Sequence, residues 1–396
     1  MKELSAIAMA ISPSATLAVD GLAKKMRADG LDVIGFGAGE PDFSTPDNIN
    51  KAAIEAINTG KTKYTPAAGM VTLRKAVARR LSDDFGIEYD PADIVVASGA
   101  KHNVYIALRT LVNPGDEVII PAPYWVTYTE AVAMVGGVPV VVYADEAHDF
   151  KITAQQLEEA ITDKTKAIII NNPSNPTGMI YSEAELRAIT DVCLKHDLYI
   201  IADEIYSALV YDKKPFTSIA SLGAEVKEHT ILVSGVSKAY AMTGWRIGFA
   251  ASNMKIAKIM GNYLSHSTSA PSTISQYAAM EALSGPQEGI AAMCAVFERR
   301  RNYICSRINA MNGVSCLIPE GAFYVMLNVE KQIGRTLGGR VIKNGDDFAM
   351  SMLETVHVAA VPCSSFGAPN FVRLTYAASD DDIREGMDRL EKFIAE

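Results

Sequence analysis

The sequence has no long apolar run, few cysteines and no long cluster of basic residues, and each absence argues against a class of protein. No segment approaches the roughly 20 apolar residues that a helix needs to cross a bilayer, so we expect no membrane anchor. The five cysteines are odd in number and lack C-x-x-C spacing, which argues against a disulfide framework and against a metal site. The formal net charge of −9 argues against nucleic acid or an anionic membrane as the partner.

The amino-terminal stretch also lacks the features of an export signal. Its apolar patch is short, and Glu3 follows directly on Lys2 where a signal would carry only basic charge. We therefore expect a cytoplasmic protein whose cysteines are reduced and structural. Neither an internal repeat nor a low-complexity tract interrupts the chain.

What is present is a chain long enough for more than one domain. Its 396 residues are 49% hydrophobic and 21% charged, which supports a large buried core. Pro286 and the glycine-containing stretch 334–345 are the clearest breaks late in the sequence. We expect a large domain over residues 46–284 and a small domain formed by residues 1–45 and 285–396.

The fold class follows from short apolar segments that alternate with helical ones. Strands alternating with helices predict an α/β protein with a mostly parallel sheet covered on both faces. The pattern predicts a first helix over 16–30 and a last one that begins after Ser379. The expected strands are residues 94–97, 117–120, 138–142, 167–170, 199–202 and 230–233.

The most informative segment follows the last of these strands and contains Lys238 and Arg246 in a Gly- and Ser-rich run. A lysine amine can form a Schiff base with a carbonyl, and an arginine guanidinium binds phosphate through its fork of donors. The pair therefore suits a phosphate-bearing aldehyde such as pyridoxal phosphate. The competing interpretation is that both are ordinary solvated charges.

Other strand ends carry polar turns, and ligands bind at the carboxyl ends of strands in open α/β sheets. The turn at 98–102 opens a helix whose free amides could receive phosphate. Segment 171–178 has two prolines and a closing glycine, and Asp203 places a carboxylate at a strand end. Taken singly, each could be a plain turn or a helix cap.

Taken together, seven segments in the same order resemble fold-type I aminotransferases of class I over nearly the whole chain. The resemblance is closest to the bacterial aspartate aminotransferase subgroup. It implies an α/β fold with a mostly parallel sheet and a smaller α+β domain. The segments are GAGEPDFSTP (37–46), YTPAAG (64–69), PYWVTY (123–128), NPTG (175–178), DEIY (203–206), SGVSKAYAMTGWRIGF (234–249) and FVRLTYA (371–377).

The resemblance implies three catalytic residues. Lys238 would form the Schiff base with pyridoxal phosphate and, once freed by substrate, move the proton between the substrate α-carbon and the cofactor. Asp203 would keep the pyridine nitrogen protonated. Tyr206 and Asn175 would hydrogen-bond the ring oxygen, and Trp125 would stack on the ring.

The resemblance also assigns the cofactor phosphate. Its donors would be the amides of residues 99–101, a serine hydroxyl and the guanidinium of Arg246. Gly235 stands where some relatives have serine, which leaves two serines open. Tyr64 would reach the phosphate of a neighbouring subunit, so the resemblance implies a homodimer with shared sites. The phosphate residues are thus Tyr64, Gly99, Ala100, Lys101, Ser234 or Ser237, and Arg246.

For the substrate, the resemblance assigns the α-carboxylate of an amino acid or 2-oxo acid to Arg373, with a backbone contact from Gly39 and further contacts from Asn175 and Trp125. Lys101, with Thr16 nearby, would meet the distal carboxylate of a dicarboxylic substrate. Ser12 stands where members that also accept prephenate carry a basic residue, which argues against that added activity.

These residues predict transamination between L-aspartate and 2-oxoglutarate. An aromatic or broad-range aminotransferase is the alternative, and a β-lyase or decarboxylase would keep the same lysine. A ligand-sensing regulator with this fold would carry an appended DNA-binding domain, for which the 38 residues before Gly39 leave too little room. A dehydrogenase is disfavoured because Glu40 replaces a required glycine.

Overall fold

Seven strands form the central sheet of the computed structural model, which describes residues 2–12 and 15–396. Within this sheet, all strands run parallel except β8, which pairs antiparallel with both of its neighbours. In spatial order they are β2 (Ile94–Ala97), β8 (Gly248–Ala251), β7 (Thr230–Gly235), β6 (Tyr199–Asp203), β5 (Thr165–Asn171), β3 (Glu117–Ala122) and β4 (Val138–Tyr143). The predicted fold class and the six predicted strands are confirmed.

Helices cover both faces of this sheet because successive strand residues point to opposite sides. Val95 and Ala97 pack with α5, α6 and α10, whereas Ile94 and Val96 pack with α3, α4 and α11. Farther along the second face, Ile168 and Ile170 pack with α7, α8 and α9. The helices are α3 (Asp47–Asn58), α4 (Val71–Phe85), α5 (Ala100–Leu111), α6 (Thr127–Met134), α7 (Ala154–Ala160), α8 (Glu183–Lys195), α9 (Ala224–His229), α10 (Met254–His266) and α11 (Thr273–Ser284).

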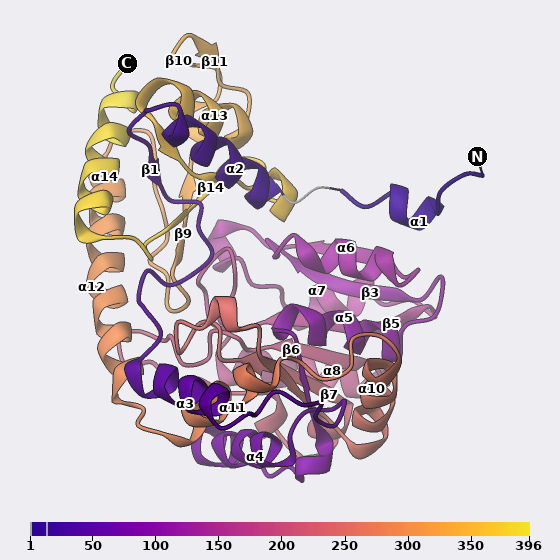
Figure 1. Cartoon of the computed structure of the whole chain (residues 1–396). Coiled ribbons are helices and arrows are strands. Elements are labelled where there is room, and N and C mark those ends of the chain that lie inside the picture. The colour runs from indigo at the N-terminus through magenta and orange to yellow at the C-terminus, as the bar shows by residue number, and fades with distance from the viewer. Residues whose placement is uncertain (1, 13–14) are drawn as a thin grey trace.

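A second layer is built from both ends of the chain (Figure 1). Its antiparallel sheet is β13 (Val361–Pro362), β14 (Phe371–Thr375) and β9 (Tyr324–Asn328), and β1 (Ile34–Gly35) pairs parallel with β12 (Val358–Ala359). A small hairpin joins β10 (Thr336–Leu337) to β11 (Arg340–Val341). The helices of this layer are α2 (Ala15–Ala28), α12 (Glu288–Ala310), α13 (Gly345–Val356) and α14 (Asp380–Ile394), whereas α1 (Ala6–Met9) lies apart from it and contacts α6.

The ends of the chain follow local sequence rules. Ser379 caps α14 by accepting a hydrogen bond from the Asp382 amide at 3.0 Å, and Ile383, Met387 and Leu390 are buried. The predicted last helix is therefore confirmed, and α2 ends close to Gly30 as expected. Figure 1 shows α1 projecting from the body of the molecule. Within the described ranges, no helix combines the length and apolar content needed to cross a bilayer.

Within the central sheet, β8 is the strand that the sequence did not predict. The segment with Lys238 and Arg246 runs between β7 and β8, which pair with each other. Gly235 at the end of β7 is in register with Gly248 at the start of β8. Gly248 has no space for a side chain, since an added Cβ would lie 2.2 Å from the Ala100 amide nitrogen and 2.4 Å from the Gly99 carbonyl carbon. The start of α5 is therefore fixed against β8.

We predict that Gly248→Ala lowers the free energy of unfolding by about 1–3 kcal/mol, because the new methyl group overlaps backbone that cannot move independently. Chemical denaturation of the purified variant measures this. Gly244→Ala is the matched control, since a Cβ there would meet nothing within 4 Å. Equal stabilities of the two variants would contradict the close contact.

Candidate active site

The carboxyl ends of β5, β6 and β7 meet at one edge of the central sheet and bring three of the polar segments together. Asn171 at the end of β5 is in register with Asp203 at the end of β6, and β7 leads directly into Lys238. Because these strands are parallel and adjacent, their following loops share one side of the sheet. This edge is the candidate site.

Asp203 is a buried carboxyl group, 2% exposed, whose partners all come from this edge. Its Oδ2 accepts a hydrogen bond from the Tyr128 hydroxyl at 2.8 Å, and its Oδ1 accepts one from the Ile205 amide at 3.3 Å. Burial raises the pKa of Asp203 to about 6, while Tyr128, Ile205 and the charge of Lys238 lower it. The group is thus ionised at neutral pH.

Lys238 is enclosed by the loops of both layers. Its ammonium donates to the Gly39 carbonyl and lies 5.7 Å from the centre of the Phe323 ring and 6.0 Å from that of Tyr206. Burial lowers the pKa of Lys238 to about 8, and the negative charges of Glu40 and, to a lesser extent, Asp203 raise it. A substantial share of this amine is therefore neutral, and nucleophilic, near physiological pH.

Arg373 on β14 reaches from the second layer into the same site and is 2% exposed. Its Nη1 donates to the Asn175 side-chain oxygen and its Nη2 to the Gly37 carbonyl, both at 3.0 Å. Its Nε is buried and has no hydrogen-bond partner among the described residues. A buried cation with a donor left over is a strong site for a carboxylate.

Tyr324 on β9 contacts both Arg373 of the second layer and Tyr206 of the first. Its ring lies under the Arg373 guanidinium at 4.3 Å, and its hydroxyl is 3.1 Å from the Tyr206 hydroxyl. Gly39 passes close by, since an added Cβ would lie 3.2 Å from the Tyr324 hydroxyl. Burial raises the pKa of Tyr206 well above its ordinary value, so this hydroxyl is a neutral donor.

The segment at the start of α5 forms a cradle with Arg246. Gly99 has φ +90°, and a Cβ there would lie 2.3 Å from Arg246 Nη2. Arg246 donates to the carbonyls of Thr243 at 2.9 Å and Ser98 at 3.2 Å. Ala100 and Lys101 begin α5, whose first amides have no partner within the helix. Amides and guanidinium together suit an anion.

The two candidate serines lie differently. Ser234 donates its hydroxyl to the Glu204 carbonyl at 3.3 Å and lines a cavity behind the sheet. Ser237 is buried in the loop that leads to Lys238. The choice of a phosphate donor between them stays a prediction.

Lys101 and Trp125 face each other at the mouth of the site. The Lys101 ammonium lies 4.7 Å above the Trp125 ring, and Trp125 packs edge-on against Tyr128 at 5.5 Å. Burial, with the charge of Arg246, lowers the pKa of Lys101. The side chain of Thr16 lies outside the described residues.

One predicted residue stands apart. The Tyr64 side chain is fully exposed, at 101% of its reference area, and contacts none of the groups above within this chain. Conversely, sequence reasoning missed Tyr128 and Tyr324. Tyr128 lies in PYWVTY, three residues after Trp125, and belongs to the first turn of α6, which Trp125 precedes. No comparable signal marked Tyr324.

Comparisons with known proteins agree with this geometry. Residues 31–390 match the family described as aminotransferase class I and II. An aspartate aminotransferase of Geobacillus stearothermophilus is 48% identical over 384 residues, which cover 97% of each chain. An aspartate/prephenate aminotransferase of Cereibacter sphaeroides is 47% identical, again over 97% of each chain.

The structure is similar as well. The crystal structure of the aspartate aminotransferase from Rhizobium meliloti has a TM-score of 0.96 and 40% identity, covering 100% of this chain and 99% of that one. The predicted family and fold type are thereby confirmed. Because the family match spans nearly the whole sequence and the fold agrees over its full length, this chain belongs to the class I and II aminotransferases.

Proposed function

We propose that this aminotransferase uses pyridoxal phosphate to move the amino group of L-aspartate to 2-oxoglutarate, giving oxaloacetate and L-glutamate. The observation that carries the proposal is the convergence of Lys238 with the buried side chains of Asp203 and Arg373 at one edge of the sheet. Relatives at 48% and 40% identity are named aspartate aminotransferases, which supports the choice of substrate.

The residues present fit the proposed cofactor. The cradle of Gly99 and Arg246, which a Cβ would fill, offers amides and a guanidinium to a phosphate. Asp203 is a buried, ionised carboxylate suited to a protonated ring nitrogen. Pyridoxal phosphate supplies an aldehyde that bonds to amines and a ring that withdraws electrons from the substrate α-carbon. Trp125 would stack on the ring, and Asn175 and Tyr206 would donate to its oxygen.

Within this scheme the chain's own groups handle the proton. The Lys238 amine, with a pKa of about 8, would take the proton from the substrate α-carbon and deliver it to the cofactor. Tyr206 and Tyr324 stay neutral and hold the surrounding geometry through their paired hydroxyls.

Two cations would bind a dicarboxylic substrate. Arg373 offers its unpartnered Nε to the α-carboxylate, and Gly39 contributes backbone to the same group. Lys101, across the mouth of the site, would meet the distal carboxylate. Ser12 carries no charge, and its amide donates to Glu130 at 3.2 Å, so we do not extend the proposal to prephenate.

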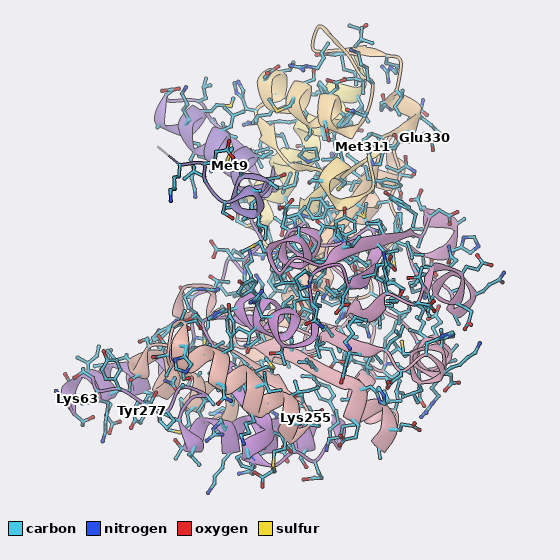
Figure 2. All side chains as sticks on the ribbon, turned by 90° about the vertical axis from the view of Figure 1, so that its right-hand side faces the viewer. Met9, Lys63, Lys255, Tyr277, Met311 and Glu330 are labelled. Carbon is cyan, nitrogen blue, oxygen red and sulfur yellow. The ribbon has the colours of Figure 1, made fainter. Side chains whose placement is uncertain are left out.

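We further propose a homodimer with shared active sites. The full exposure of Tyr64, together with exposed Ile54 and Ile57 on α3, supports a partner subunit on this face. Figure 2 shows Lys63, which precedes Tyr64, at the same projecting corner as Tyr277. The projecting segment with α1 exposes Leu4, Ile7, Met9 and Ile11 in the same way.

The domain division also stays a proposal, with residues 46–284 as the large domain and residues 1–45 and 285–396 as the small one. Arg373 and Tyr324 belong to the second layer, and their contacts to Asn175 and Tyr206 in the first support closure of the small domain over substrate. The cytoplasmic location predicted from the sequence remains a prediction.

We predict that L-aspartate alone converts the yellow form of the purified protein to the pyridoxamine form, at a far lower concentration than L-phenylalanine. Visible absorption spectra measure this conversion. Lys238→Ala abolishes it, since loss of a positioned proton carrier alone costs about 10²–10⁴-fold, whereas Lys255→Ala on the outside of α10 leaves it unchanged.

Conversion by phenylalanine at equal concentration would favour the aromatic or broad-range alternative. No visible band after addition of pyridoxal phosphate, or turnover that persists in Lys238→Ala, would contradict the proposed chemistry.

We predict that Lys101→Ser raises the KM for aspartate, with a loss in kcat/KM of about 10–100-fold, because a hydrogen bond to a charged group is removed. Steady-state kinetics with alanine and phenylalanine provide the control, since neither has a distal carboxylate. Equal losses on all three substrates would mean that Lys101 serves the phosphate or the fold instead.

We predict that the apoenzyme takes up pyridoxal phosphate faster as pH rises from 7 to 8, and that the rate then levels off. The neutral amine is the reactive form, so uptake falls by about tenfold per unit below a pKa of about 8. Stopped-flow absorbance measures the rate between pH 7 and 10, a range that lies above the pKa of Asp203. The same measurement with acetyl-lysine gives the pH dependence of a solvent-exposed amine for comparison. A rate that keeps rising to pH 10 would contradict the lowered pKa.

A further inference from the structure

A cavity of about 730 Å³ lies behind the candidate active site, on the other side of the Lys238 segment. It is bounded by β7 and α4, by the segment 204–213 that follows β6, and by the first turns of α12. None of the groups that bind the proposed cofactor other than Ser234 lines it. A volume of several hundred cubic ångströms is typical of a small-molecule pocket, which is about 300–1,000 Å³.

Glu204 brings an unusual polar group to this cavity. It follows Asp203 at the end of β6, so its side chain points to the opposite face of the sheet. The residue is 1% exposed, and its Oε1 accepts a hydrogen bond from the Ile219 amide at 2.9 Å. Its Oε2 is buried and forms no hydrogen bond of normal geometry with any described residue.

An unsatisfied carboxyl oxygen of this kind is costly to keep buried. Burial raises the pKa of Glu204 to about 8, although the Ile219 amide and the neighbouring Ser218 hydroxyl lower it. A cation placed beside Oε2 would restore the ionised form and complete its hydrogen bonds.

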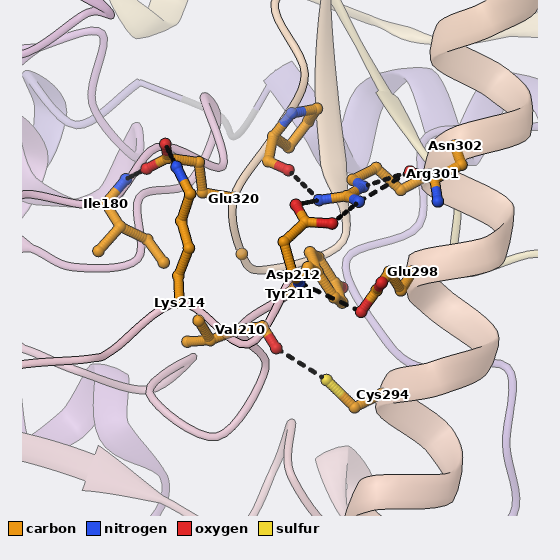
Figure 3. Close-up of polar contacts among 12 residues, drawn as sticks. Ile180, Val210, Tyr211, Asp212, Lys214, Cys294, Glu298, Arg301, Asn302 and Glu320 are labelled. Carbon is orange, nitrogen blue, oxygen red and sulfur yellow. Dashed lines mark hydrogen bonds and ion pairs between the residues drawn. The ribbon is translucent and has the colours of Figure 1, made fainter.

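The remaining walls are mostly apolar. Leu232 and Phe249 come from the sheet, Leu81 and Phe85 from α4, and Ile290 from α12. Cys294 does not compete for a ligand, because its thiol donates to the Val210 carbonyl at 3.3 Å. Figure 3 shows Cys294 and Glu298 on α12 facing the segment that contains Val210.

The rim carries charges of both signs, since Arg80 and Lys213 are cationic and Asp84 and Glu298 are acidic. Arg80 pairs with Asp84 at 2.7 Å, so the charges of these two groups offset each other. Tyr240 donates to the Gln287 side-chain oxygen at 2.7 Å, so this pair is also satisfied. Glu298 adds a second acidic group near the opening. The rim charges thus balance, and the preference for a positive ligand group comes from the unpartnered Glu204 oxygen.

We propose that this cavity is a binding site, separate from the active site, for a small apolar molecule that carries a protonated amine. Its N–H donates to Glu204 Oε2, and its apolar part packs between α4 and the start of α12. The cavity is open at Ala291 and Ala295 on α12, both of which are exposed, so a ligand enters without unfolding the protein.

The test uses dimethylphenethylamine, a tertiary amine that cannot form a Schiff base with the cofactor. Isothermal titration calorimetry on the holoenzyme should detect saturable binding, and phenethyl alcohol should bind at least about tenfold more weakly because it lacks the charge. Glu204→Gln keeps the volume of the side chain, removes the charge and should weaken binding of the amine by a similar factor.

A second pair of variants locates the ligand without touching the buried carboxyl. Ala291→Trp fills the mouth of the cavity and should abolish binding, whereas Ala292→Trp, at the next exposed position of α12 and outside the cavity lining, should not change it. Binding that survives Ala291→Trp, equal effects of the two tryptophans, or no binding of the amine to the wild type would overturn the proposal. Since no turnover is measured, these outcomes do not depend on the substrate of the active site.

Discussion

The structure around the active site depends on keeping the charged side chains of Asp203 and Arg373 almost entirely out of water, with the half-buried Lys238 beside them. A buried charge is tolerated only where hydrogen bonds and opposite charges replace the lost solvent. Tyr128 and the Ile205 amide do this for Asp203, and Gly37 and Asn175 do it for Arg373. Each of these partners comes from a different element, so the site exists only when the whole chain is folded.

On the side where a ligand would bind, the hydrogen bonds and opposite charges only partly replace the lost solvent. Arg373 keeps one donor free, and desolvation shifts the pKa of Lys238 downwards and that of Asp203 upwards, towards neutrality. An anionic substrate and a cationic ring would complete both sets of interactions. Binding and folding therefore draw on the same electrostatic requirement.

Much of this arrangement could be predicted from the sequence because it rests on local patterns. The strands before Asp203 and Lys238 are continuous apolar runs, the mark of parallel strands buried on both faces. The strand β8 escaped prediction because Gly-Phe-Ala-Ala carries no alternation and its pairing is antiparallel. Tyr324 was missed for another reason: its role comes from packing between two layers that are remote in the sequence.

The pairing of Gly235 with Gly248 has a consequence for how such a chain can vary. The loop between them carries both Lys238 and Arg246, and it is tied at each end to a strand in the middle of the sheet. Replacing one side chain of this loop leaves the spacing between Lys238 and Arg246 unchanged. An insertion or deletion, in contrast, would shift the lysine and the arginine relative to each other. Because Gly235 and Gly248 are paired, the ends of the loop cannot move to compensate for the change in length. The length of the loop between Gly235 and Gly248 is therefore more constrained than its composition.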